Sequence, residues 1–186
     1  MCSRASRQIN AMKRVGRYMD SDGRLMMYKS FIRSNFSYCP VTWIFCGKKN
    51  SAKLEKLQER ALRFVYNDYD NNYADLLSKA NLLSLSMFRL RFLAIEVYRC
   101  VMKINPKYMN DMFSRRELKY GLRDLDKLHQ ARYKTKKFGY RSFKYFGAKL
   151  WNALPIEIKR IDKLHIFKRE LTKWCGSEKA TQLEIF

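Results

Sequence analysis

The sequence predicts an all-α fold: an irregular helical bundle of about eight helices, with a basic loop region before the last helices. Apolar residues recur at intervals of three and four along most of the chain, which is the spacing of one helix face. Glycine (7) and proline (3) are scarce among the 186 residues, which disfavours a turn-rich β fold. Hydrophobic residues make up 47% of the chain and aromatic residues 15%, which is enough to bury a core.

We divide the chain into four regions by composition and periodicity. They are a helical hairpin with a buried aromatic helix (1–49), a helical core (50–113), a basic loop region (114–141) and C-terminal helices with a frayed tail (142–186). Outside the third region, most residues follow helical spacing. We therefore expect mostly one domain.

The first two helices are expected to form a hairpin with basic outer faces. Residues 3–19 place apolar residues at helical spacing, with arginine and lysine mostly on the other side. Residues 20–23 are typical of a turn, and Asp22 can cap a second helix over residues 24–34.

The next two elements are a short aromatic helix and a long amphipathic one. Residues 35–46 are mostly apolar, and we expect a buried helix with Pro40 in its first turn. Residues 50–68 are expected to form a helix capped by Asn50 or Ser51. Its apolar stripe consists of Leu54, Leu57, Ala61, Phe64 and Val65, and its solvent-facing side includes Glu55, Lys56, Glu59, Arg60 and Arg63.

Two further helices are expected before the composition changes. Residues 73–79 predict a short helix. Residues 85–103 predict a long helix with Ser84 as its cap, and apolar residues cover more than half of its circumference, so it should lie in the middle of the core. Pro106 ends this pattern, and residues 108–113 are expected to make one more turn.

The segment after residue 113 is dominated by positive charge. Between residues 114 and 144 there are 11 Lys and Arg against 3 acidic residues, and basic and aromatic residues alternate over residues 129–141. We expect a loop or a short extended pair here. Helices are then expected over residues 142–154, 156–160 (opened by Pro155) and 163–174, the last stopped by Gly176 and followed by a frayed tail.

The charge balance points to a polyanionic partner. The chain has 39 Lys and Arg against 17 Asp and Glu, a formal net charge of +22. Self-repulsion of this size destabilises a compact domain, and a polyanion relieves it by releasing counterions. We therefore expect the backbone of RNA or DNA as partner; an acidic protein or a membrane surface remains the alternative.

Two groups of residues are candidates for nucleic-acid binding. The first is the basic face of the N-terminal hairpin: Arg7, Lys13, Arg14, Arg17, Lys29 and Arg33. The second is a basic and aromatic segment: Arg132, Tyr133, Lys134, Lys136, Lys137, Tyr140, Arg141 and Lys144. Lysine and arginine would neutralise phosphates, and the tyrosines would stack on unpaired bases. The alternative for the second group is a solvated loop whose aromatic residues pack into the core.

The sequence contains no recognisable catalytic or metal-binding pattern. Polymerases need paired aspartates to hold two metal ions, but the residue after Asp75 is Leu76, and the surrounding pattern is helical. Cys39 and Cys46 are too far apart for a zinc knuckle, and His129 and His165 do not complete one. There is no Walker loop, GxGxxG or HExxH motif. We expect no cofactor, no metal and no small-molecule substrate.

Cysteine usage and hydropathy indicate an intracellular protein. The five cysteines are odd in number and widely spaced, and no apolar signal segment precedes them, so we expect reduced thiols in the nucleus or cytoplasm. No apolar run approaches the roughly 18 residues of a transmembrane helix, so we expect no membrane insertion.

Six blocks of sequence occur in a fixed order over nearly the whole chain. They are residues 6–14 (SRQINAMKR), 28–32 (YKSFI), 35–43 (NFSYCPVTW), 53–63 (KLEKLQERALR), 143–155 (FKYFGAKLWNALP) and 167–169 (FKR). In this order they resemble the region after the palm in reverse transcriptases of non-long-terminal-repeat (LINE, jockey-like) retrotransposons.

The resemblance implies a role in holding nucleic acid without catalysis. Residues 1–49 would include the polymerase thumb, which holds the template–primer duplex by its backbone, and the rest would be a C-terminal extension that contacts template RNA or target DNA. The fingers, the palm with its aspartate pair and the endonuclease have no counterpart here, so the resemblance implies a fragment that is not an enzyme by itself. A terminal Cys–His zinc cluster of some relatives is reduced to Cys175.

Two other functions stay open from the sequence. One is a helical protein-interaction module that self-associates through exposed apolar surface. The other is a free-standing basic protein associated with chromatin or ribosomes.

Overall fold

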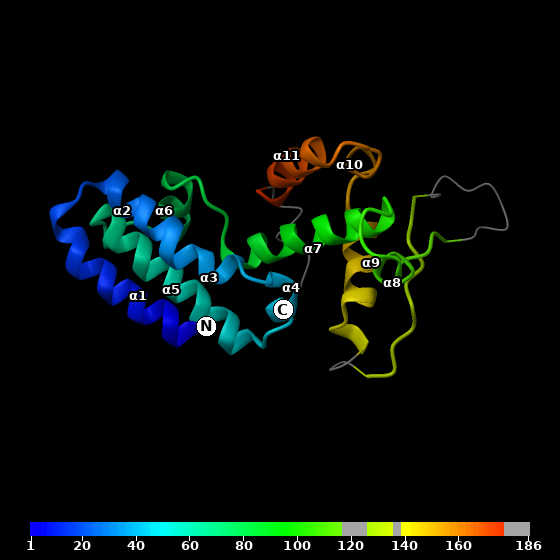
Figure 1. Cartoon of the computed structure of the whole chain (residues 1–186), viewed down its shortest axis with the longest axis horizontal. Coiled ribbons are helices and arrows are strands. Elements are labelled where there is room, and N and C mark those ends of the chain that lie inside the picture. The colour runs from blue at the N-terminus through cyan, green and yellow to red at the C-terminus, as the bar shows by residue number, and fades with distance from the viewer. Residues whose placement is uncertain (117–125, 136–138, 177–186) are drawn as a thin grey trace. The chain divides into compact units, whose positions relative to one another are not determined.

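The structure is a computed structural model that describes residues 1–116, 126–135 and 139–176. These residues form an all-α fold, as predicted, with the helices labelled α1 to α11 in Figure 1. Within the described residues the extended pairing is limited to one antiparallel bridge between Arg115 and Leu128. The described helices outnumber the about eight expected, although each segment predicted to be helical contains or overlaps one of them. The expected frayed tail lies largely outside the described residues.

The chain divides into two compact units, Met1–Arg89 and the residues from Leu90 onward. The first unit contains α1 (Cys2–Val15), α2 (Ser21–Met27), α3 (Arg33–Ser37), α4 (Pro40–Trp43), α5 (Lys48–Tyr66) and α6 (Tyr73–Lys79). A 3-10 turn (Gly16–Tyr18) follows α1, and a π-helical segment (Tyr28–Ile32) joins α2 to α3. Residues 21–37 therefore form one continuous helical rod, longer than the helix predicted over residues 24–34.

The cap of this rod is Asp20, and the prediction of Asp22 was wrong. Asp20 has extended backbone angles (φ −70°, ψ 175°), and its Oδ1 accepts a hydrogen bond from the Gly23 amide at 2.8 Å. Asp22 already lies in the first helical turn, where its carboxylate favours the positive end of the helix dipole.

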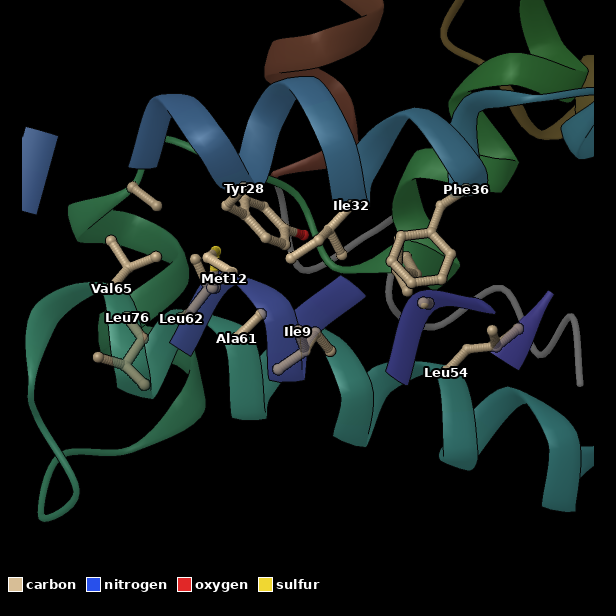
Figure 2. Packing of buried hydrophobic residues seen from close by; sticks show 13 residues of the cluster. Ile9, Met12, Tyr28, Ile32, Phe36, Leu54, Ala61, Leu62, Val65 and Leu76 are labelled. Atoms are coloured by element: carbon tan, nitrogen blue, oxygen red, sulfur yellow. The ribbon is translucent and has the colours of Figure 1, made fainter. Parts of the chain in front are cut away.

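The core of the first unit lies between α1, the rod of residues 21–37, α5 and α6 (Figure 2). The rod contributes residues spaced four apart, which is one face of a helix. The buried side chains labelled in Figure 2 are Ile9, Met12, Tyr28, Ile32, Phe36, Leu54, Ala61, Leu62, Val65 and Leu76. The aromatic stretch after the rod is only partly buried: Ile44 is fully buried, whereas Tyr38 is exposed.

Helix α5 starts earlier than predicted. Gly47 is its N-cap, so the expectation of Asn50 or Ser51 was wrong. Ser51 is instead buried, and its hydroxyl accepts a hydrogen bond from Arg89 at 2.6 Å. Leu57 and Phe64 are half-buried at the edge of the predicted stripe, while Gln58 and Leu62 join its buried part; the stripe is rotated slightly from its expected direction.

Glu55 caps the next long helix instead of facing water. Its carboxylate accepts hydrogen bonds from the Leu85 amide (3.2 Å), the Ser86 amide (2.7 Å) and the Tyr73 hydroxyl (2.8 Å). Burial and the neighbouring Glu55 raise the pKa of Tyr73, so its hydroxyl remains a donor. The predicted Ser84 cap is confirmed, since its Oγ accepts from the Met87 amide at 3.3 Å.

Arg89 is the largest fully buried side chain of the first unit. Its guanidinium donates to the Leu85 carbonyl (3.1 Å), to Cys46 Sγ (3.1 Å) and to Ser51 Oγ (2.6 Å). Its Cζ also lies 5.0 Å from the centroid of the Trp43 ring, within range of a cation–π interaction. Burial lowers the pKa of Arg89, while Cys46 and Glu55 oppose that shift. The guanidinium therefore joins α7 (Leu85–Val101) to α4 and α5.

The second unit is built on α7 (Leu85–Val101), whose first turns belong to the first unit. It also contains α8 (Lys107–Asn110), α9 (Phe143–Ala153), α10 (Ile156–Lys159) and α11 (Leu164–Cys175). Ser142 caps α9 by accepting from the Tyr145 amide. Tyr98 stacks on Phe167 with 4.1 Å between ring centroids, and its hydroxyl donates to the Asp162 carbonyl at 2.6 Å. This aromatic contact ties α7 to α11.

Trp151 and Asn152 hold the loop before α9 in place. The Trp151 indole donates to the Asp126 carbonyl at 3.0 Å. The Asn152 amide both donates to the Leu128 carbonyl (3.0 Å) and accepts from the Leu128 amide (2.8 Å). The side chain of Asn152 thus replaces the backbone partner that Leu128 would have in a sheet, which satisfies both polar groups of that residue.

Three helices end in the same left-handed turn. Asn67, Asn81 and Lys103 have φ of 49°, 50° and 57°. In each case the next amide donates to the carbonyl five residues earlier: Asp68 to Arg63, Leu82 to Leu77, and Ile104 to Arg99. This is the Schellman arrangement, in which glycine is usual and asparagine is tolerated. Lysine is an unusual residue there, and its left-handed backbone costs about 1–2 kcal/mol.

Gly147 permits the close approach of α7 and α9. A Cβ atom at this position would lie 2.8 Å from Val97 Cγ2 and 2.9 Å from Phe113 Cζ. We expect Gly147→Ala to lower the free energy of unfolding by about 1–2 kcal/mol, because overpacking outweighs the better helix propensity of alanine. Urea unfolding followed by circular dichroism measures this. Gly176→Ala is the matched control, since its backbone is right-handed helical (φ −81°) and the nearest atom to its Cβ position, the Lys173 carbonyl oxygen, is at an ordinary 3.4 Å. A Gly147→Ala variant as stable as wild type would contradict the packing.

Candidate nucleic-acid interface

The outer face of α1 carries arginine without any acidic residue. Ala5, Ile9 and Met12 form its buried side. Arg7 and Arg14 lie on the opposite side, two turns or about 10 Å apart along the axis. Both are exposed, and neither makes a hydrogen bond or ion pair within the described residues. Arg4, one turn before Arg7, is also exposed; its i,i+3 spacing to Arg7 places it on the same side of the helix, although it was not predicted as a binding residue.

Helices α1 and α5 lie side by side and run in the same direction (Figure 1). Arg60 Nη2 donates to Asn10 Oδ1 at 2.6 Å, and Gly16 lies against the Phe64 ring farther along. Because both helices rise equally per residue, this register places Arg7 at about the level of Lys56.

The flank of α5 beside α1 is also basic. Lys49, Lys53 and Lys56 precede Arg60 at intervals of three and four, so all lie on the same side of the helix, and the three lysines are exposed. The two acidic residues of this helix lie elsewhere: Glu55 binds Tyr73 and the start of α7, and Glu59 pairs with Arg63 at 2.8 Å. We name the combined face the α1–α5 basic surface, comprising Arg4, Arg7, Arg14, Lys49, Lys53 and Lys56.

The other members of the first candidate group are divided by the structure. Arg17 and Lys29 are exposed, without a hydrogen bond or ion pair among the described residues. Lys13 and Arg33 are half-buried instead: Lys13 Nζ lies 6.0 Å from the Phe64 ring centroid, and Arg33 Cζ lies 5.4 Å from that of Phe88. These two cations are held against aromatic rings, so they are less available to a phosphate.

The second candidate group forms a tyrosine cluster edged by cations. Tyr133 meets Tyr140 and Tyr145 at 5.6 and 4.7 Å between ring centroids, in edge-to-face geometry. Lys149 Nζ lies 5.4 Å from the Tyr140 centroid and donates to its hydroxyl at 3.3 Å. Gly139 is required beside Tyr133, because a Cβ there would lie 2.5 Å from the Cβ of Tyr133.

The cations of this second group are exposed wherever the structure describes them: Arg132, Lys134, Arg141 and Lys144. Lys136 and Lys137 lie outside the described residues. Tyr133 is 40% exposed and Tyr140 is half-buried, so the rings pack on one another while keeping some free edge. The sequence did not indicate Tyr145, which joins the cluster from the first turn of α9.

The described residues offer no arrangement for metal chemistry. No group of three His, Cys, Asp or Glu within them is placed to hold an ion. Asp75 is exposed in the first turn of α6 while Leu76 is buried, so the helical interpretation of this segment is confirmed. Burial raises the pKa of Cys175 to about 12, so this thiol stays protonated at neutral pH. No helix in the described part is both long and apolar enough to span a bilayer.

Comparison of the chain with protein-family models, with curated proteins and with solved structures gave no match. The chemistry of its own surfaces is therefore the basis for assigning a function.

Proposed function

We propose that the chain is a piece of a non-long-terminal-repeat retrotransposon reverse transcriptase that binds RNA–DNA duplex through its phosphate backbone. It has no polymerase activity of its own, since it carries no aspartate pair. The α1–α5 basic surface carries this proposal: six cations on two parallel helices, with the acidic residues of α5 bonded elsewhere. The six ordered sequence blocks supply the family.

Several features support backbone binding over base readout. The cations project from helix faces at intervals of one to two turns, which suits a series of phosphates along a duplex. Helix α1 contains no aromatic residue, so its arginines offer phosphate contacts and no ring on which a base could stack. The tyrosine cluster of Tyr133, Tyr140 and Tyr145 is the second contact, toward unpaired bases or the strand leaving the duplex.

Exposed apolar residues favour a second function, self-association. Val15 (58% exposed), Phe31 (61%), Met26 (71%) and Tyr18 (92%) lie on α1 and the rod of residues 21–37 or between them. A shallow groove of about 230 Å³ runs between these elements beside Val15 and Phe31. An exposed apolar surface of this kind can pair with a second copy, although the net charge of +22 opposes it.

Size-exclusion chromatography separates the two functions. The purified chain is run at high salt, with and without prior nuclease digestion. The nucleic-acid function predicts that nuclease and salt convert any large species into monomer. Self-association that survives both treatments supports the second function instead. A primer-extension assay with Mg²⁺ should show no product, and clear extension would refute the non-catalytic assignment.

A further inference from the structure

The second unit contains a cavity of about 800 Å³ beside α8. This volume lies within the range of about 300–1,000 Å³ typical of small-molecule sites. Its apolar wall includes Val101, Phe113 and Leu128. Since the wall is both aromatic and aliphatic, it can cover a flat, partly apolar group such as a nucleobase.

Of the described residues, those lining this cavity include three cations, Lys103, Lys107 and Arg115, and one carboxylate, Asp111. All four residues are exposed, and no ion pair joins any of them to another described residue. Three cations at one cavity mouth favour an anionic ligand, and arginine suits phosphate in particular. An apolar wall beside a cationic mouth suits a ligand that has both a flat apolar part and an anionic part.

Lys103, at the cavity, also has an unusual backbone conformation. This residue ends α7 in the left-handed conformation (φ 57°) that glycine adopts without strain. Asn67 and Asn81 occupy the same position in the other two turns of this kind, and asparagine tolerates it. A strained lysine at the cavity therefore puts a cation where the fold itself would favour glycine or asparagine.

From these observations we infer that the cavity binds one nucleoside monophosphate unit, with its phosphate at Lys103, Lys107 and Arg115 and its base against Phe113. The inference rests on the proposed nucleic-acid function, because the expected source of the unit is an unpaired nucleotide of a bound strand. The backbone of the paired region would then lie on other basic surfaces, and the cavity would distinguish unpaired from fully paired substrates.

The test compares two RNA–DNA hybrids of equal length on the full chain. One is fully paired, and the other carries a single unpaired 2-aminopurine nucleotide whose fluorescence reports its environment. We expect the wild type to bind the second about tenfold more tightly, which corresponds to about 1.4 kcal/mol. Lys103→Gly and Arg115→Gln should each remove most of this preference, while Lys163→Gln, an exposed lysine outside the cavity, should retain it.

Lys103→Gly keeps the test independent of folding. Glycine relieves the left-handed strain, so the melting temperature should stay equal or rise while the preference is lost. Calorimetric titration of wild type and Lys103→Gly with free AMP shows whether a free nucleotide also fills the site. AMP binding that is lost in Lys103→Gly supports the cavity site, with a free nucleotide as a ligand.

The outcomes separate this inference from the proposed function. Salt-dependent binding of both hybrids with equal affinity, and no AMP binding, overturns the cavity site and leaves the backbone function standing. A preference that survives both cavity variants also overturns it. If neither hybrid binds, the proposed function is overturned. If AMP does not bind either, the cavity site is overturned as well.

Discussion

Replacing four cations of the α1–α5 basic surface is expected to weaken binding of RNA–DNA hybrid by about 100-fold at 100 mM salt. The variant is Arg7→Gln, Arg14→Gln, Lys53→Gln and Lys56→Gln together. All four side chains are exposed and make no hydrogen bond or ion pair with another described residue, so the change should leave the fold intact. Each lost phosphate contact should also reduce the salt slope by about one.

The control for this variant has to separate location from total charge. Lys79→Gln on α6, Lys163→Gln just before α11, and Lys168→Gln and Lys173→Gln on α11 together remove the same formal charge from exposed positions outside every binding group named above. Fluorescence anisotropy of a labelled hybrid measures both variants. If the control loses as much affinity as the surface variant, binding follows net charge alone and the α1–α5 basic surface has no special role.

Arg89→Ala is expected to lower the free energy of unfolding by about 3 kcal/mol. The substitution empties the space of a fully buried side chain and removes hydrogen bonds to Ser51 Oγ and the Leu85 carbonyl. It also removes the cation beside the Trp43 ring. The contacts between the start of α7, α4 and α5 should therefore loosen together.

Arg89→Met is the matched comparison, since methionine fills most of the same volume without polar atoms. We expect it to cost about 1–2 kcal/mol, because Ser51 loses its partner while the packing is mostly kept. Urea unfolding with circular dichroism gives both values. An Arg89→Ala variant within 0.5 kcal/mol of wild type, roughly the effect of a surface substitution, would show that the buried guanidinium is not a structural link.

Periodicity predicted the helices well because most of them bury one face locally. The helix at α6, the Ser84 cap and the end of α11 at Gly176 could all be predicted from neighbouring residues alone. The choice between Asp20 and Asp22 could not, because both precede a helical pattern and only the backbone geometry distinguishes them. The sequence predicted Ser142 as the first residue of the helix over residues 142–154, whereas the structure has Ser142 as the cap that precedes α9.

Tertiary partners explain what the sequence could not predict. Glu55 fits a solvent-facing position of an amphipathic helix, but the amides of Leu85 and Ser86, 30 residues away, bring it into the interior. Arg89 similarly interrupts an apolar helix face and is buried nevertheless. In the candidate interface, Lys53 and Lys56 fit an ordinary charged face; only the parallel pairing of α1 and α5 joins them to the arginines.

The salt dependence of hybrid binding tests the central claim most directly. Anisotropy titrations of an RNA–DNA hybrid between 50 and 200 mM salt give the slope of log K against log salt. If the six cations of the α1–α5 basic surface neutralise six phosphates, the slope is about −5 and the affinity falls about a thousandfold over this range. A flat dependence, or no binding at 50 mM salt, would contradict the proposal that this chain binds nucleic acid through the phosphate backbone.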